Sequence, residues 1–131
     1  MDEKRLADEL ALLRTAHPDV EDRSVDGAVW ARIPEYSVPD GWSAQSVELA
    51  FQIPVQAGQA PYGFYVRPAL KLANGTVPSN YTAAATTPWG DDFAKFSWSP
   101  LEQWIPKVNV REGANMLNFV RSFADRFQEL I

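Results

Sequence analysis

Residues 46–54 read SVELAFQIP, and this stretch decides the fold. Its apolar residues Val47, Leu49, Phe51 and Ile53 alternate strictly with more polar ones. A period of two is the signature of a β-strand with one buried and one wetter face. We therefore expect a strand over Ser46–Ile53, packed by its apolar face against the rest of the molecule.

One further strand is expected before this strand and one after it. Residues 28–33 alternate in the same way, and residues 63–67 are apolar and aromatic. Leu70 and Leu72 are expected to extend the sheet, and the pair Asn74–Gly75 to close a small hairpin. The polar residues 19–27 predict a loop, and residues 34–41, with two prolines and an Asp40–Gly41 pair, predict a turn.

Both ends of the chain predict helices. Leu6, Leu10 and Leu13 lie on one helical stripe within residues 2–15. A longer apolar stripe predicts a second helix over 112–130. Residues 78–110 show no sustained period, so we expect an irregular aromatic segment there, with a flexible Ala83–Thr87 loop.

These elements fit one α+β domain over residues 1–131. The expected order is an N-terminal helix (1–17), a sheet (28–77), the irregular aromatic segment (78–110) and a C-terminal helix (112–130). Consecutive strands with helices at the ends imply an antiparallel meander with helices covering one face. A chain of 131 residues is the usual size of one domain.

The composition excludes several classes of function. A net charge of −5 argues against nucleic acid and anionic membranes as partners. The chain has no cysteine and one histidine, His17, so thiolate and multi-histidine metal sites are excluded. We expect no metal and no cofactor. The charged start lacks an apolar signal core, which predicts a cytoplasmic protein.

Few side chains are candidates for catalysis. His17 precedes a proline at a helix end, where a capping or surface role is expected. Asp91, Asp92 and Glu102 could serve a small hydrolase only if they faced one another across a cleft. The chain has no phosphate loop and no nucleophile elbow.

Aromatic residues are the stronger candidates for binding. Trp42, Tyr62, Trp89 and Phe93 fall in or near expected loops, and aromatic side chains make good interface anchors. Trp42 and Trp89, each beside a glycine, are expected to be the exposed ones. The alternative for each of the four is ordinary packing in the core.

Taken in order, these features resemble the ubiquitin-conjugating-enzyme superfamily, in particular its prokaryotic class E branch. The stretch 47–54 is similar to the second strand of that fold, and 60–68 (APYGFYVRP) to its proline-led third strand. Residues 96–100 (FSWSP) and 104–106 (WIP), followed by an amphipathic helix, resemble the tryptophan–x–proline element. Residues 38–42 (VPDGW) resemble the class E pattern.

The resemblance also shows what is missing. Conjugating enzymes carry a cysteine shortly before that tryptophan, and here Phe96 and Ser97 stand at its approximate position. The family's His-Pro-Asn motif is absent too. Transthiolation needs a thiolate, whereas a serine could form only an oxyester and would need a nearby base. We therefore expect no catalytic residue.

The resemblance implies a non-catalytic protein, like conjugating-enzyme variants and RWD domains. We expect a protein-binding adaptor in a bacterial ubiquitin-like conjugation system. Its partner would be a ubiquitin-like protein, or an activating or deconjugating enzyme. Two alternatives stay open at this point: a structural or scaffold subunit of a complex, and a small carboxylate-based hydrolase.

Overall fold

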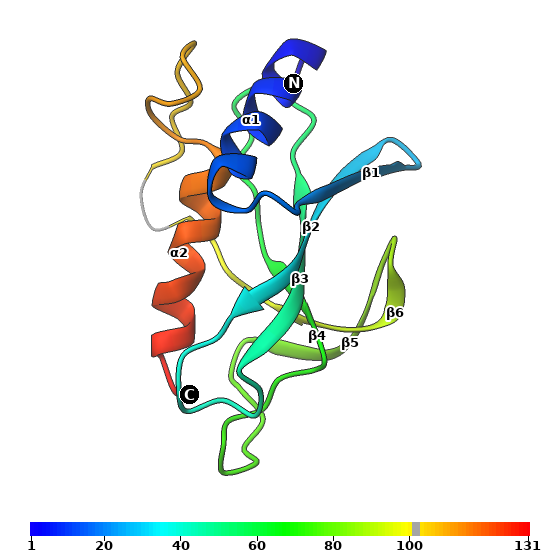
Figure 1. Ribbon diagram of the computed structural model, residues 1–131, viewed down its shortest axis with the longest axis vertical. Helices are drawn as coiled ribbons and strands as arrows, with labels where there is room; N and C mark the ends of the chain where they lie inside the picture. The colour runs from blue at the N-terminus through cyan, green and yellow to red at the C-terminus, as the bar shows by residue number, and fades with distance from the viewer. Residues whose placement is uncertain (101–102) are drawn as a thin grey trace.

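The strand that decides the fold forms where its period places it. The computed structural model describes residues 1–100 and 103–131. Its elements, in chain order, are α1 (Glu3–Ala16), β1 (Glu21–Val25), β2 (Ala28–Ser37), β3 (Ser46–Ile53), β4 (Phe64–Arg67), β5 (Tyr81–Thr87), β6 (Gly90–Phe96) and α2 (Met116–Gln128). Figure 1 shows both helices on one side of a single sheet. The expected α+β class with helices covering one face is confirmed.

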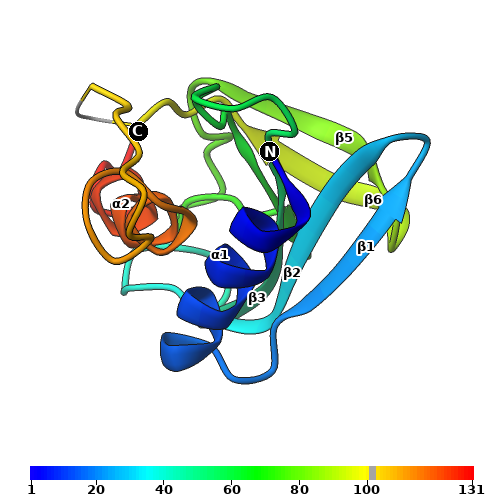
Figure 2. The ribbon, with the colours of Figure 1, turned by 90° about the horizontal axis from the view of Figure 1, so that it is seen from above.

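The sheet is antiparallel at every pairing. Its six strands lie in the order β1-β2-β3-β4-β6-β5. The first four strands form a meander, and the hairpin of β5 and β6 then adds β6 beside β4. The sheet is strongly curled, as Figure 2 shows. Arg23 of β1 donates a hydrogen bond to the carbonyl of Pro88, in the β5–β6 turn, at 2.7 Å.

The main core lies between the sheet and the helices. The four apolar residues of β3 that alternate in the sequence are all buried there. Phe64 of β4 stacks on Phe96 of β6 at 5.1 Å between ring centroids and on Phe123 of α2 at 4.1 Å. The apolar stripe predicted for the second helix supplies Phe123 and Phe127 to this cluster, and Phe119 of the same helix joins them. The helix stripe and the strand alternation therefore meet on one face of the sheet.

Side chains fix where the helices begin. Asp2 caps α1 by accepting from Arg5 N at 2.7 Å, and Asn115 caps α2 by accepting from Asn118 N at 2.8 Å. The prediction that the second helix begins at residue 112 is wrong. Gly113 has a φ of +67°, which a helix does not accommodate, so the helix starts only after the Asn115 cap.

Residues 19–27 are not the loop that their polarity predicts, because β1 occupies Glu21–Val25. Every residue of β1 is exposed, so a buried-face pattern could not reveal it. Asp26 and Gly27 have φ values of +52° and +80° and close the β1–β2 turn. The Asp26–Gly27 pair is itself a strong hairpin signal.

The expected turn over 34–41 is also partly wrong, because β2 continues to Ser37. Pro34 lies beyond Arg32, the last residue of β2 to pair with β1. On its other side the register with β3 shifts between Ile33 and Tyr36. A proline without an N–H is tolerated at such a bulge. β2 therefore continues through Pro34, although a proline usually ends a strand.

The prediction that residues 78–110 are irregular is wrong for much of this range, because two strands occupy it. The Ala83–Thr87 run is not a flexible loop but part of β5, and β6 follows it. Register shifts lie between Thr82 and Ala85 and between Ala85 and Thr87, so two bulges interrupt the pairing with β6. They also obscure the period of two in the sequence.

The region around Asn74–Gly75 holds a tight turn but no hairpin of strands. Leu72 N donates to Thr76 O at 3.0 Å, which closes the turn around Gly75. Leu72 makes only an isolated bridge with Trp42, and Leu70 is buried in the main core. Neither leucine extends the sheet as a strand.

Candidate interaction site

Two of the four aromatic residues proposed for binding are buried. Trp42 is 7% exposed, and its indole Nε1 donates to Phe127 O at 2.7 Å. The expectation that Trp42 is exposed is therefore wrong. Phe93 is fully buried in a second, small cluster with Trp30 and Ala50. These two side chains hold the fold together and present no surface to a partner.

The other two aromatic residues reach the surface. Tyr62 is 57% exposed and Trp89 is partly exposed. Lys95 Nζ lies 5.6 Å from the Tyr62 ring centroid and 5.4 Å from that of Tyr65. The Arg23 guanidinium lies 5.0 Å over the Trp89 ring. Such cation–aromatic contacts hold the rings in place at the surface.

Charged residues form a ladder across five strands of the sheet. It runs from Glu21 through Arg32, Glu48 and Arg67 to Asp92, with N–O distances of 2.8 to 3.1 Å. Hydrogen bonding from Arg67, followed by that from Arg32, lowers the pKa of Glu48 despite some desolvation. Hydrogen bonding from Arg67 likewise lowers the pKa of Asp92. Both carboxylates are therefore held in the ionised form.

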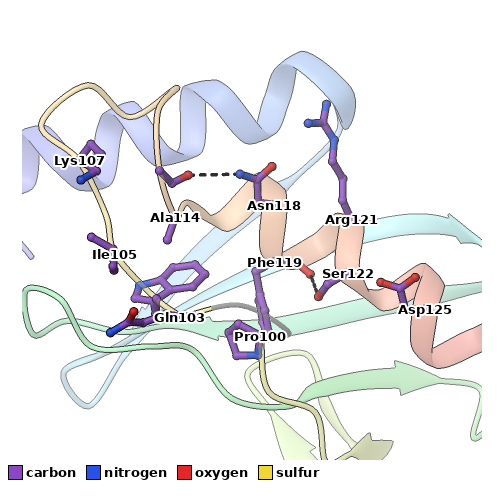
Figure 3. A pocket seen from close by; sticks show the side chains of 12 residues that line it. Pro100, Gln103, Ile105, Lys107, Ala114, Asn118, Phe119, Arg121, Ser122 and Asp125 are labelled. Carbon is purple, nitrogen blue, oxygen red and sulfur yellow. Dashed lines mark hydrogen bonds between the residues drawn. The ribbon is translucent and has the colours of Figure 1, made fainter.

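A cavity of about 630 Å³ lies between α2 and the segment before it. Figure 3 shows Ile105 and Lys107 along one side, and Asn118, Arg121, Ser122 and Asp125 along α2 on the other. Trp104 and Phe119 add aromatic surface to its lining. A second, smaller cavity of about 250 Å³ lies between the start of α1 and the 104–108 segment. None of the side chains that the sequence indicated for binding is among the described residues that line the larger cavity.

The approximate position of the missing cysteine is divided between core and strand end. Phe96 is fully buried between Phe64 and Phe127 of α2, and Ser97 follows it with its backbone N–H bonded to Asn80 O at 2.9 Å. The only histidine lies elsewhere, since His17 stacks on Tyr36 at 6.3 Å. Burial, with a smaller contribution from Arg121, lowers the pKa of His17. None of the hydrogen bonds among the described residues pairs Ser97 with His17 as its base.

The carboxylates named for a hydrolase do not form a catalytic pair in the described structure. Asp91 and Asp92 are both exposed, and Asp92 is engaged by Arg67 at 2.8 Å. Glu102 lies outside the described residues. Within the described part of the chain, no group of three or more His, Asp or Glu side chains could hold a metal ion.

Comparison with known families decides the broader assignment. The family model of prokaryotic E2 family E matches residues 6–121. The chain belongs to prokaryotic E2 family E. The resemblance inferred from the sequence is thereby confirmed, and the match covers the fold from α1 into α2. Comparisons with curated proteins and with solved structures give no match to this chain.

Membership of prokaryotic E2 family E assigns no role to individual side chains. Partner binding by Tyr62 and Trp89 stays a prediction. Arg23 and Lys95, which contact these rings, were missed by sequence reasoning because their contacts depend on strand pairing. Neither helix among the described residues has the length and apolarity required to cross a membrane.

Proposed function

We propose that this member of prokaryotic E2 family E is a non-catalytic, protein-binding adaptor in a bacterial ubiquitin-like conjugation system. Its partner is a ubiquitin-like protein or an enzyme that activates or deconjugates one, and it acts in the cytoplasm. The observation that carries this proposal is the absence of cysteine from all 131 residues of a chain of this family. Without a thiolate, the chain cannot carry an acyl group as a thioester.

The surroundings of Ser97 support the same conclusion. A serine hydroxyl becomes a nucleophile only when a base removes its proton. The imidazole of His17 is engaged with Tyr36, at the far end of α1 from its cap, rather than with Ser97. His17 is therefore not placed to act as the base that formation of an oxyester on Ser97 would require.

The face of the sheet that points away from the helices, the open face, offers the surface for binding. Tyr62, just before β4, and Trp89, in the β5–β6 turn, border it with their rings near Lys95 and Arg23. Exposed aromatic rings beside cations are typical anchors of protein interfaces. This pattern favours adaptor binding over a purely structural role, in which the same rings would be expected in the core.

The decisive experiment measures covalent and non-covalent binding side by side. Each ubiquitin-like and activating-enzyme-like protein of the source organism is mixed with this chain, magnesium and ATP. Intact mass spectrometry then reports adducts, and biolayer interferometry reports complexes. We expect an unchanged mass together with a measurable complex. A hydroxylamine-sensitive adduct that disappears in Ser97→Ala would overturn the proposal, and so would the absence of any complex.

A matched pair of variants locates the binding surface. Tyr62→Ala and Val77→Ala each remove an apolar side chain of similar exposure, 57% and 58%. Tyr62→Ala is expected to weaken the complex about tenfold, as truncating an interface anchor commonly does. Val77→Ala, in the β4–β5 connection, is expected to leave it unchanged. Equal losses of affinity in the two variants would show that the interface does not lie on the open face.

A further inference from the structure

The cavity beside α2 is built like a binding site rather than a packing defect. Its volume of about 630 Å³ is within the range of ordinary ligand pockets. Ile105, which lines it, is 47% exposed, whereas Phe119 at its base is almost fully buried. An apolar side chain that enters from solvent can therefore contact Ile105 and the partly exposed ring of Trp104.

The walls of the cavity are held in place by hydrogen bonds. Ala114 N donates to Ile105 O at 3.0 Å, and Arg5 of α1 donates to the carbonyls of Lys107 and Ala114. A Cβ on Gly113 would lie 2.6 Å from Ile105 O, so only glycine permits this close approach. The segment is therefore preformed, which reduces the entropy lost on binding.

The opposite wall is equally fixed. Trp98 Nε1 donates to Ser122 Oγ at 3.0 Å, and Ser122 Oγ donates to Phe119 O at 2.6 Å. The exposed Asn118, Arg121 and Asp125 follow one another along the surface of α2. Figure 3 shows these side chains rising from the helix around the cavity.

Among the described residues, the charge around the cavity is opposite to that of the whole chain. The chain carries 12 basic and 17 acidic residues. Among the described residues that line the cavity, Lys107 and Arg121 are basic and only Asp125 is acidic. Arg121 lies one helical turn before Asp125 on α2, and Lys107 makes the end of the cavity at the 105–107 segment basic. A carboxylate is the complementary group for that end.

From these features we propose that the cavity binds an extended peptide segment of a partner protein, with one bulky apolar side chain and a neighbouring acidic one. The apolar side chain packs against Trp104 and Ile105, and the carboxylate pairs with Lys107 or Arg121. This proposal rests on the adaptor function above, because it specifies what kind of segment the adaptor recognises. It places recognition at a second surface, separate from Tyr62 and Trp89.

The test selects peptides without any component of a conjugation system. A random peptide library displayed on phage is panned against the whole chain and against Arg121→Glu. We expect enriched peptides that combine acidic and bulky apolar residues, and that are lost on Arg121→Glu. An enriched peptide is then synthesised and titrated into the ¹⁵N-labelled protein. Its signals are expected to change at the Trp104 indole and along residues 118–125.

Control variants separate local from overall charge. Lys107→Glu and Arg121→Glu should each weaken binding of the selected peptide about tenfold or more. Lys71→Glu makes the same change in net charge at an exposed residue that does not line the cavity, and it should have almost no effect. Melting temperatures confirm that all three variants fold.

Three results would overturn the proposal. They are enrichment of no peptide, enrichment of basic peptides, and shifts confined to the Tyr62 and Trp89 surface. Each would leave the adaptor function standing, because that function is tested by complex formation with conjugation components. Conversely, an adduct on Ser97 would refute the adaptor function while the peptide titration still reported on the cavity.

Discussion

The two faces of the sheet are stabilised in different ways. Toward the helices, the strands contribute fully buried rings and aliphatic side chains to one continuous core. Toward the other side, the same strands carry a ladder of ion pairs and a small cluster of Trp30, Ala50 and Phe93. One face therefore depends on volume and packing, and the other on charge. The difference predicts that core truncations and changes of pH will act on different residues.

The largest effect is expected in the covered face, at Phe64. Phe64→Ala removes a fully buried ring that stacks on Phe96 and Phe123. Large-to-small changes of this kind cost about 3–5 kcal/mol. Urea denaturation followed by circular dichroism measures the loss. A cost below about 1 kcal/mol would mean that neighbouring rings refill the space, and that the covered face is less dependent on volume than we infer.

Glu9 is the next test, because it is a carboxylate on the covered side. It is 2% exposed, accepts from Met116 N at 2.9 Å and pairs with Arg5 at 3.2 Å, so it ties α1 to the start of α2. Glu9→Ala leaves these donors without their acceptor and should cost about 1–3 kcal/mol. Glu9→Gln keeps an acceptor for Met116 and should cost less.

The pH dependence of the free energy of unfolding provides a second test of Glu9. Burial raises its pKa above the ordinary value of 4.5, against the lowering effects of Met116 and Arg5. The folded state then holds a proton that the unfolded state has released, so this residue's contribution to stability falls as pH rises from 4.5 through the raised pKa. Glu9→Gln should remove that fall. Identical profiles of stability against pH for the variant and the parent would contradict this prediction.

Glu48 should behave in the opposite way on the open face. Hydrogen bonding from Arg67 and Arg32 lowers its pKa below 4.5. Its contribution is therefore present above pH 4.5 and is lost as pH falls through the lowered pKa. Because the group is partly solvated, Glu48→Gln should cost only about 1 kcal/mol at neutral pH. Denaturation profiles from neutral to acidic pH would show a shallower decline in the variant.

The smallest effect on stability is expected at Tyr62. Tyr62→Ala removes a largely exposed ring and should change the free energy of unfolding by no more than about 0.5 kcal/mol. Trp89→Ala should also leave a folded protein, since Trp89 is only partly buried against the small cluster. Thermal denaturation measures both. A large loss in either variant would show that the ring supports the fold and is not held ready for a partner.

Sequence reasoning worked where one face of an element is buried and failed where neither is. The Ser46–Ile53 strand and the first helix show clean periods, and both form. β1 lies at one edge of the sheet and is exposed throughout. β5 lies at the other edge and is bulged. Edge strands need little burial, so their residues carry little of the hydrophobic pattern on which prediction depends.

The candidate surface was predicted only in part for a similar reason. Trp42 follows Asp40–Gly41, which indicates a loop, but Leu130 from the C-terminal end packs against Gly41 and helps to cover this region. Contacts between residues so distant in the chain cannot be read from local sequence. The same holds for the pairing of Arg67 with Glu48, which depends on the register between β3 and β4.

The bulges in β5 have a consequence for association between molecules. β5 ends the sheet and contains no charged residue to repel a neighbouring strand. A second strand could extend the sheet there only if the spacing of backbone groups were regular, and the two bulges break that spacing. Irregular backbone thus protects this edge from amyloid-like stacking, the task that Glu21, Asp22 and Arg23 perform at the edge formed by β1.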